Sequence, residues 1–181
     1  MTSLVVQLQI VLVLVCSLVV LRGIGWLGVR QLSTWRAAGL GAVAIVFLVT
    51  SSAHFNGMKY DLAAMLPADF PGGLGIIYLT GVFEIAGAIG LLVPRTRRLA
   101  GICLVLLLAA LFPANVYAAL NGISLSGEPP TPLWLRAPEQ LLYVGMVWWT
   151  AISAQPMAAG RRPNRENIAE HKQAFPGGAT S

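Results

Sequence analysis

The stretch Leu74-Gly-Ile-Ile-Tyr78-Leu-Thr-Gly-Val-Phe-Glu84-Ile-Ala-Gly-Ala-Ile-Gly90-Leu-Leu-Val93 decides the fold. Its 20 residues, at about 1.5 Å per helical residue, cover roughly the 30 Å hydrocarbon thickness of a bilayer. Glu84 is the only charged residue in it. A carboxylate at that depth costs about 2.5–3.5 kcal/mol on insertion scales. The stretch therefore predicts a membrane-spanning helix whose acid has either a polar partner or a function.

The composition of the whole chain agrees with this prediction. Of its 181 residues, 56% are hydrophobic and only 10% are charged, which predicts a multi-pass protein of the cell membrane with the lipid bilayer as its surroundings. The net charge of +5 comes from basic residues spaced between apolar runs, a distribution that excludes nucleic acid as a partner. Cys16 and Cys103 stand alone in separate apolar runs. They predict two small buried side chains and no metal site.

Four more apolar runs predict membrane helices on either side of Leu74–Val93. In the fourth span, Pro113 removes one backbone hydrogen bond and predicts a kink that leaves the carbonyl of Ala109 without its donor. A polar segment around residues 58–67, ended by Pro67, predicts a short helix lying in the membrane interface. Whether the first run crosses the membrane stays open. The five predicted spans are Ser3–Leu21, Ala37–Phe55, Leu74–Val93, Leu99–Leu120 and Ala137–Ile152.

The predicted fold class is all-α: a polytopic membrane protein with a four-helix transmembrane bundle and one additional N-terminal transmembrane helix. Residues 1–36 form that helix and an inner-face connection, 37–153 the four-helix core, and 154–181 a polar, disordered cytoplasmic tail. The connections after successive spans carry three, one, three, one and four Lys or Arg residues. Positive charge collects on the cytoplasmic side, so we expect the N-terminus outside and the C-terminus in the cytoplasm.

This topology brings polar residues of spans two to five to the outer half of the bundle. In an outward-facing cavity these residues would bind a ligand. Glu84 would relay a proton or hold a polar ligand head, and His54 would titrate near neutral pH. Alternatively, the same groups only hydrogen-bond across helices, each bond contributing about 0.6 kcal/mol. The inner half offers nothing comparable apart from Cys103. The ligand-binding candidates are His54, Glu84, Asn115, Arg136, Gln140, Tyr78 and Tyr117.

Several of these residues lie in short motifs that resemble a known family. The elements are His54-Phe55, Met65-Leu-Pro67, Tyr78-Leu-Thr-Gly-Val-Phe-Glu84, Arg97-Arg98-Leu-Ala100, Phe112-Pro-Ala-Asn115-Val-Tyr117 and Arg136-Ala-Pro-Glu-Gln140. In order and spacing, from about Ala37 to Trp149, they resemble the DoxX-like family of small membrane proteins. The resemblance implies a four-helix membrane core and a link to membrane redox complexes or oxidative-stress tolerance. The first span and the tail lie outside it.

The resemblance and the residues together suggest three functions. The first is a membrane subunit whose outer cavity binds a quinone-like or other small polar-headed molecule in a redox context, beside a redox or other protein partner. No haem, flavin or iron–sulfur pattern occurs in the chain, so no cofactor other than a quinone is expected. The second is a membrane scaffold that seats a partner protein without a ligand. The third, a small transporter, has less support, because no internal repeat is visible.

Overall fold

The computed structural model describes residues 8–67, 70–125, 127–129 and 131–153. Within these ranges the protein is all helical and has no named strand. The elements are α2 (Gln9–Trp26), η1 (Arg30–Leu32), α3 (Trp35–Ser51), η2 (Ser52–His54), α4 (Lys59–Ala64), α5 (Gly73–Leu92), α6 (Arg97–Leu120), α7 (Leu133–Val147) and η3 (Trp148–Ile152). The predicted tail, 154–181, and the start of the first predicted span lie outside the described residues.

Four of these helices are long and apolar enough to cross a membrane: α2, α3 continued by η2 to His54, α5 and α6. The fifth predicted span is α7, whose 15 residues pass directly into the five-residue π-helix η3. The all-α membrane bundle predicted from the sequence is therefore confirmed. The stretch quoted first forms α5 almost to the residue, because Gly72, with φ +104°, precedes it and Pro94 follows it.

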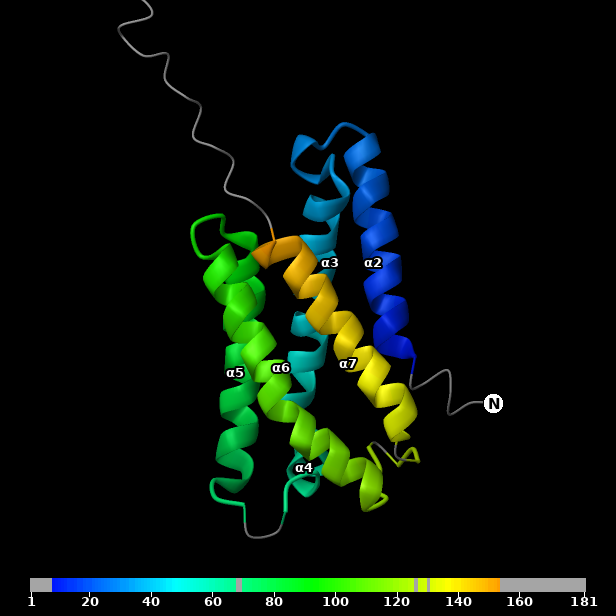
Figure 1. Ribbon diagram of the computed structural model, residues 1–181, viewed down its shortest axis with the longest axis vertical. Helices are drawn as coiled ribbons and strands as arrows, with labels where there is room; N and C mark the ends of the chain where they lie inside the picture. The colour runs from blue at the N-terminus through cyan, green and yellow to red at the C-terminus, as the bar shows by residue number, and fades with distance from the viewer. Residues whose placement is uncertain (1–7, 68–69, 126, 130, 154–181) are drawn as a thin grey trace, which may run out of the picture.

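Four helices form a closed ring in which α3 packs on α5, α5 on α6, α6 on α7, and α7 with η3 on α3 again. Neighbours run in opposite directions (Figure 1). Leu91, Leu104 and Val147 are the largest apolar side chains fully enclosed within this ring. Large apolar residues on the outward faces, such as Leu106 and Leu141, stay exposed, as expected where lipid is the solvent.

The N-terminal helix α2 lies outside the ring and packs along α3 (Figure 1). The predicted end of this span at Leu21 is wrong, since α2 continues to Trp26. Arg22 is accommodated inside the helix because its guanidinium lies over the rings of Trp26 and Trp35, at 4.9 and 5.4 Å. The first predicted connection is accordingly shorter and consists mainly of η1.

Small residues let the helices of the ring approach closely. A Cβ on Gly90 would lie 2.7 Å from the Cβ of Ala100, and one on Gly87 would overlap Leu104. These α5 glycines therefore pack against α6 of the same chain. Cys16 and Cys103, in contrast, are exposed on the outer faces of α2 and α6, so the prediction that they are buried within the protein is wrong.

Candidate functional site

The centre of the site is a buried pair formed by His54 and Glu84. His54 ends η2, directly after α3, and Glu84 lies in the middle of α5. The Nε2 atom of His54 is 3.6 Å from Oε1 of Glu84, and the two residues are 7% and 6% exposed. The sequence predicted that Glu84 has either a polar partner or a function, and in the structure His54 lies beside it as a polar partner.

Two threonines and one backbone carbonyl fix the orientation of this pair. Thr50 donates a hydrogen bond of 2.9 Å to Oε2 of Glu84. On the far side of the imidazole ring, Nδ1 of His54 lies 2.7 Å from the carbonyl oxygen of Ile77 and 3.1 Å from Oγ1 of Thr80. Thr80 in turn donates to the same carbonyl at 2.8 Å. Every heteroatom of the His54–Glu84 pair therefore faces a polar atom of the protein.

These contacts indicate which atoms of the pair carry hydrogens. The Ile77 carbonyl only accepts hydrogen bonds, so Nδ1 of His54 carries a hydrogen. This assignment follows from the bonding partners. The opposite nitrogen, Nε2, then faces Oε1 of Glu84 across 3.6 Å. A lone pair facing a carboxylate oxygen repels it, whereas one proton on either atom makes the contact attractive. A proton on either Nε2 or Oε1 would therefore favour this contact, which at 3.6 Å is longer than a hydrogen bond.

A glycine brings the two helices close enough for the pair to form. A Cβ added to Gly81 would lie 2.6 Å from the Cβ of His54 and 2.9 Å from its Cγ. Gly81 is buried and lies one helical turn from Glu84 on α5. The absence of a side chain at position 81 therefore positions the imidazole ring against α5.

A second polar cluster joins α6 to α7. Nη1 of Arg136 donates to Oδ1 of Asn115 at 2.6 Å, and Nε2 of Gln140 donates to the carbonyl of Leu108 at 2.7 Å. Two further atoms, Nε of Arg136 and Oε1 of Glu139, are buried without a hydrogen-bond partner within the described part of the chain. The second cluster thus contains polar atoms that a ligand or water molecule could satisfy.

Gln140 also compensates for the irregularity at Pro113. The helix α6 continues through this proline, and its ribbon changes direction in its C-terminal half (Figure 1). The bond from Gln140 reaches the carbonyl of Leu108, one residue before the Ala109 carbonyl that the proline deprives of its donor. An amide on α7 therefore stabilises the part of α6 where the backbone ladder is interrupted.

The two candidate tyrosines lie outside these clusters. Tyr78 is 37% exposed, and its ring centre is 6.0 Å from that of Phe55. The ammonium of Lys59 lies 5.4 Å from the Tyr78 ring centre, and hydrogen bonding to the Tyr78 side chain raises the pKa of Lys59. Tyr117 is half-buried, and its carbonyl accepts a bond of 2.8 Å from Asn121. Neither tyrosine has a described contact with His54 or Glu84.

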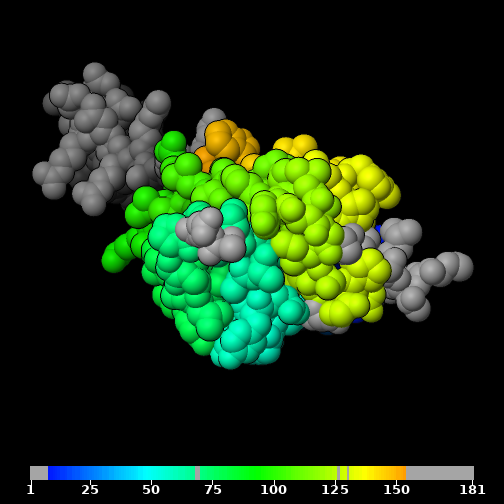
Figure 2. All heavy atoms as spheres, turned by 90° about the horizontal axis from the view of Figure 1, so that it is seen from below, coloured from blue at the N-terminus to red at the C-terminus, as the bar shows by residue number. Residues whose placement is uncertain are grey.

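Five of the seven sequence-predicted residues therefore lie in two clusters at one end of the bundle, and the two tyrosines lie outside them. Seen end-on, this end is built from the segment around α4, the start of α5, the end of α6 and the start of α7, which lie side by side (Figure 2). Within the described residues, no hydrogen bond or ion pair connects the His54–Glu84 pair with the Asn115–Arg136 cluster. Thr50 and Thr80 were not predicted, although each precedes a site residue by four positions and so shares its helical face.

The opposite end of the bundle also carries polar groups, contrary to the expectation from the sequence. Arg97 donates to the carbonyl of Leu91 at 3.0 Å, and Arg36 donates to the carbonyl of Trp149 and to Ser153. Residues flanking a span can fold back onto it, and the sequence spacing alone does not reveal this. Among the described residues, no group of three or more His, Cys, Asp or Glu side chains could hold a metal ion.

Comparison with known proteins relates the sequence of this site to one family, whose description names no activity. The family model described as "Domain of unknown function (DUF8561)" matches residues 43–151, more than half of the chain. That range includes both clusters and omits α2. No curated protein and no solved structure matches the chain.

Proposed function

We propose that this chain, which belongs to the DUF8561 family, is a membrane subunit that binds the polar head of a quinone-like or other small polar-headed molecule at the end of the bundle containing His54 and Glu84. The observation that carries the proposal is the buried His54–Glu84 pair, with 3.6 Å between Nε2 and Oε1. Ionisable residues inside membrane spans are costly and mark ligand or proton pathways.

The chemistry of the site fits such a ligand in two ways. A quinone head presents carbonyl oxygens that need hydrogen-bond donors. A proton on Nε2 of His54 or on Oε1 of Glu84 would be one such donor when the ligand replaces the 3.6 Å contact between these two atoms. The second cluster supplies Nε of Arg136, which is buried and without a partner in the described structure. The likeness of the site motifs to the DoxX-like family supports a redox or oxidative-stress context, with a redox protein as partner.

A scaffold function is the second candidate, and a specific observation favours it. Most polar atoms of the site already have a partner from the protein itself. These partners are Thr50, the carbonyls of Ile77 and Leu108, and Asn115. Such bonds also hold helices together without any ligand. In that case the bundle would seat a partner protein, and its polar residues would only fix the helix arrangement.

The experiment that separates the two is purification in native lipid followed by mass spectrometry of the small molecules that accompany the protein. We expect a quinone-like molecule with the wild type and its loss in Glu84→Gln at normal membrane abundance. The Glu128→Gln variant, which removes an acid from the loop between α6 and α7, should retain it. A Glu84→Gln variant that retains the molecule, or a wild type that carries only a protein partner, would favour the scaffold.

We propose that the end of the bundle carrying the α2–α3 and α5–α6 connections faces the cytoplasm, with the N-terminus outside and the C-terminus inside. Each connection, together with the helix ends beside it, carries three basic residues: Arg22, Arg30 and Arg36 at the first, and Arg95, Arg97 and Arg98 at the second. Both connections lie at one end of the bundle, opposite α4 (Figure 1). Single cysteines at positions 97 and 59, after removal of Cys16 and Cys103, test this orientation. A membrane-impermeant thiol reagent added to intact cells should label position 59 and leave position 97 unlabelled. Labelling of position 97 instead would reverse the assignment.

A further inference from the structure

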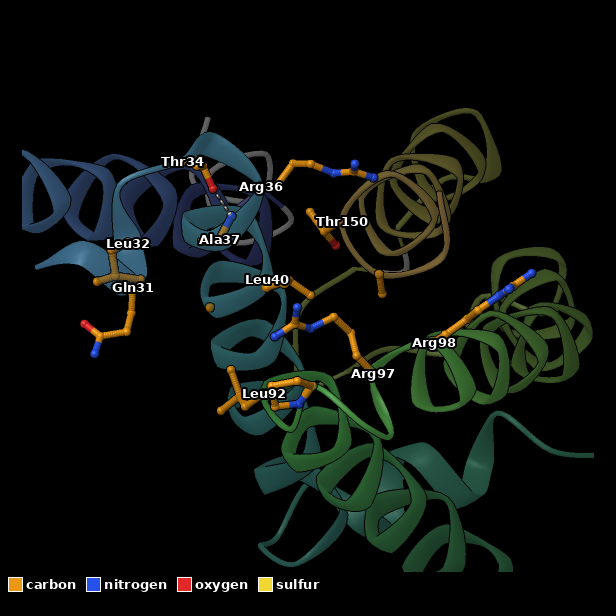
Figure 3. A pocket seen from close by; sticks show the side chains of 13 residues that line it. Gln31, Leu32, Thr34, Arg36, Ala37, Leu40, Leu92, Arg97, Arg98 and Thr150 are labelled. Atoms are coloured by element: carbon orange, nitrogen blue, oxygen red, sulfur yellow. Dashed lines mark hydrogen bonds between the residues drawn. The ribbon is translucent and has the colours of Figure 1, made fainter. Parts of the chain in front are cut away.

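A pocket of about 870 Å³ lies at the end of the bundle opposite the His54–Glu84 pair. Its wall is formed by η1, the start of α3, the end of α5, the start of α6 and η3. In Figure 3 the side chain of Arg97 extends into the space beside Leu40, that of Arg36 extends toward η3, and that of Arg98 extends away from Leu40. The pocket is therefore bounded by helices that are distant in sequence and is separate from the site described above.

The charge of the lining has one sign. Arg36, Arg97 and Arg98 all contribute to it, and no Asp or Glu does. The α3 and α6 helices both begin at the pocket, so their N-terminal ends add positive partial charge in the same direction. Basic side chains and helix N-terminal ends at one pocket, without an acid in its lining, favour an anion there.

Much of the hydrogen-bonding capacity of these arginines is unused by the protein. Arg97 uses Nε for the Leu91 carbonyl, which leaves its two terminal nitrogens. Arg36 uses Nε and Nη2, which leaves Nη1. The side chain of Arg98 makes no hydrogen bond within the described part of the chain. Guanidinium groups arranged in this way suit the oxygens of a phosphate.

Besides the arginines and the polar side chains of Gln31, Thr34 and Thr150, the lining has an apolar part. Leu40, Leu92 and Pro94 contribute to the same wall, and Trp35 and Trp149 lie exposed at this end of the bundle, as is usual at the boundary between membrane and water. A free phosphate would leave these apolar side chains without a contact. A phosphate attached to a glycerol and acyl chains would contact both parts of the lining.

We propose that this pocket binds the phosphate headgroup of an anionic glycerophospholipid, with Arg97 and Arg36 on the phosphate, Arg98 at the rim, and the first acyl carbons against Leu40 and Leu92. Basic pockets between membrane helices recognise anionic headgroups in this way. The proposal is independent of the function proposed for the His54–Glu84 site.

Native mass spectrometry of the full chain in detergent, titrated with phosphatidylglycerol, phosphatidylcholine or inorganic phosphate, tests the proposal. We expect phosphatidylglycerol to remain bound at least tenfold more tightly than phosphatidylcholine. Inorganic phosphate should displace it only at concentrations far above those of the lipid. Arg98→Gln, which removes charge without breaking a described bond, should weaken phosphatidylglycerol binding about fivefold, which corresponds to about 1 kcal/mol per basic residue. Arg97→Gln and Arg98→Gln together should weaken it more.

Arg95→Gln is the matched control, since Arg95 is exposed in the same connection and does not line the pocket. It should bind the lipid as the wild type does. Arg97→Lys keeps the charge and loses Nε, so it separates lipid binding from the bond to the Leu91 carbonyl, and it should retain most of the binding. Equal binding of both lipids, displacement by phosphate at matched concentration, or equal loss in the Arg95 and Arg98 variants would each overturn the proposal.

Discussion

Replacing Glu84 tests whether the buried pair is arranged as described. Glu84→Gln keeps an oxygen that accepts from Thr50, at 2.9 Å in the wild type, and its amide nitrogen can donate to Nε2 of His54. We expect a stability change of less than about 1 kcal/mol, because each hydrogen bond is replaced by a neutral one. Glu84→Ala instead leaves His54 Nε2 buried without this partner, while Thr50 keeps its bond of 3.2 Å to the Phe47 carbonyl. The unsatisfied nitrogen costs about 1–3 kcal/mol, and the cavity adds to this.

The assay is thermal unfolding in detergent, followed by tryptophan fluorescence. For a chain of this length, 1 kcal/mol shifts the midpoint by about 2–4 °C, so the alanine variant should melt at least 4 °C below the glutamine variant. A double-mutant cycle with His54→Ala should give a coupling of about 0.5–3 kcal/mol between the two positions. If Glu84→Ala and Glu84→Gln melt together, or the coupling is zero, the reasoning about the buried pair and its contacts is refuted.

Two further predictions concern packing and the second cluster. Gly81→Ala places a Cβ 2.6 Å from that of His54, so we expect the free energy of unfolding to fall by about 1–3 kcal/mol, measured by thermal unfolding. Gly75→Ala, whose Cβ meets open space, is the control and should be neutral or stabilising. Equal melting temperatures of the two variants would contradict the close approach at Gly81. Asn115→Ala removes the oxygen that accepts from Arg136 at 2.6 Å, and it should lower the free energy of unfolding by about 1–3 kcal/mol. Asn115→Asp keeps an acceptor, and its melting temperature should be close to that of the wild type. An alanine variant as stable as the wild type would show that Arg136 is already satisfied by other groups.

The ends of a helix could be predicted from the sequence where residues that interrupt a helix, such as proline, follow the apolar run. The span predicted at Leu74–Val93 is α5, Gly73–Leu92, since Pro94 and the following arginines terminate it. The first span was misplaced because Arg22 was taken as an end signal. In the structure, two tryptophans cover its guanidinium and the helix continues to Trp26.

The candidate site was only partly predictable. Hydropathy and charge could bring His54 and Glu84 to the same half of the bundle, but their contact depends on the rotation of α3 against α5, which the close approach at Gly81 determines. Thr50 and Thr80 were missed because threonine is common in membrane helices. Their spacing of four residues from His54 and Glu84 was the available signal.

The π-helical turn that ends the chain's last described helix has a consequence for comparing relatives. A π turn contains one residue more than an α turn, so the side chains beyond it point in directions that a continuous α-helix would give to their neighbours. In this chain the result is that Thr150 and Ala151 meet Gly39 and Gly101, where added Cβ atoms would lie 2.8 and 2.9 Å away. A relative one residue shorter at this point would present different side chains there and would need compensating changes at positions 39 and 101. Gaps placed by sequence alignment in this region therefore carry structural information.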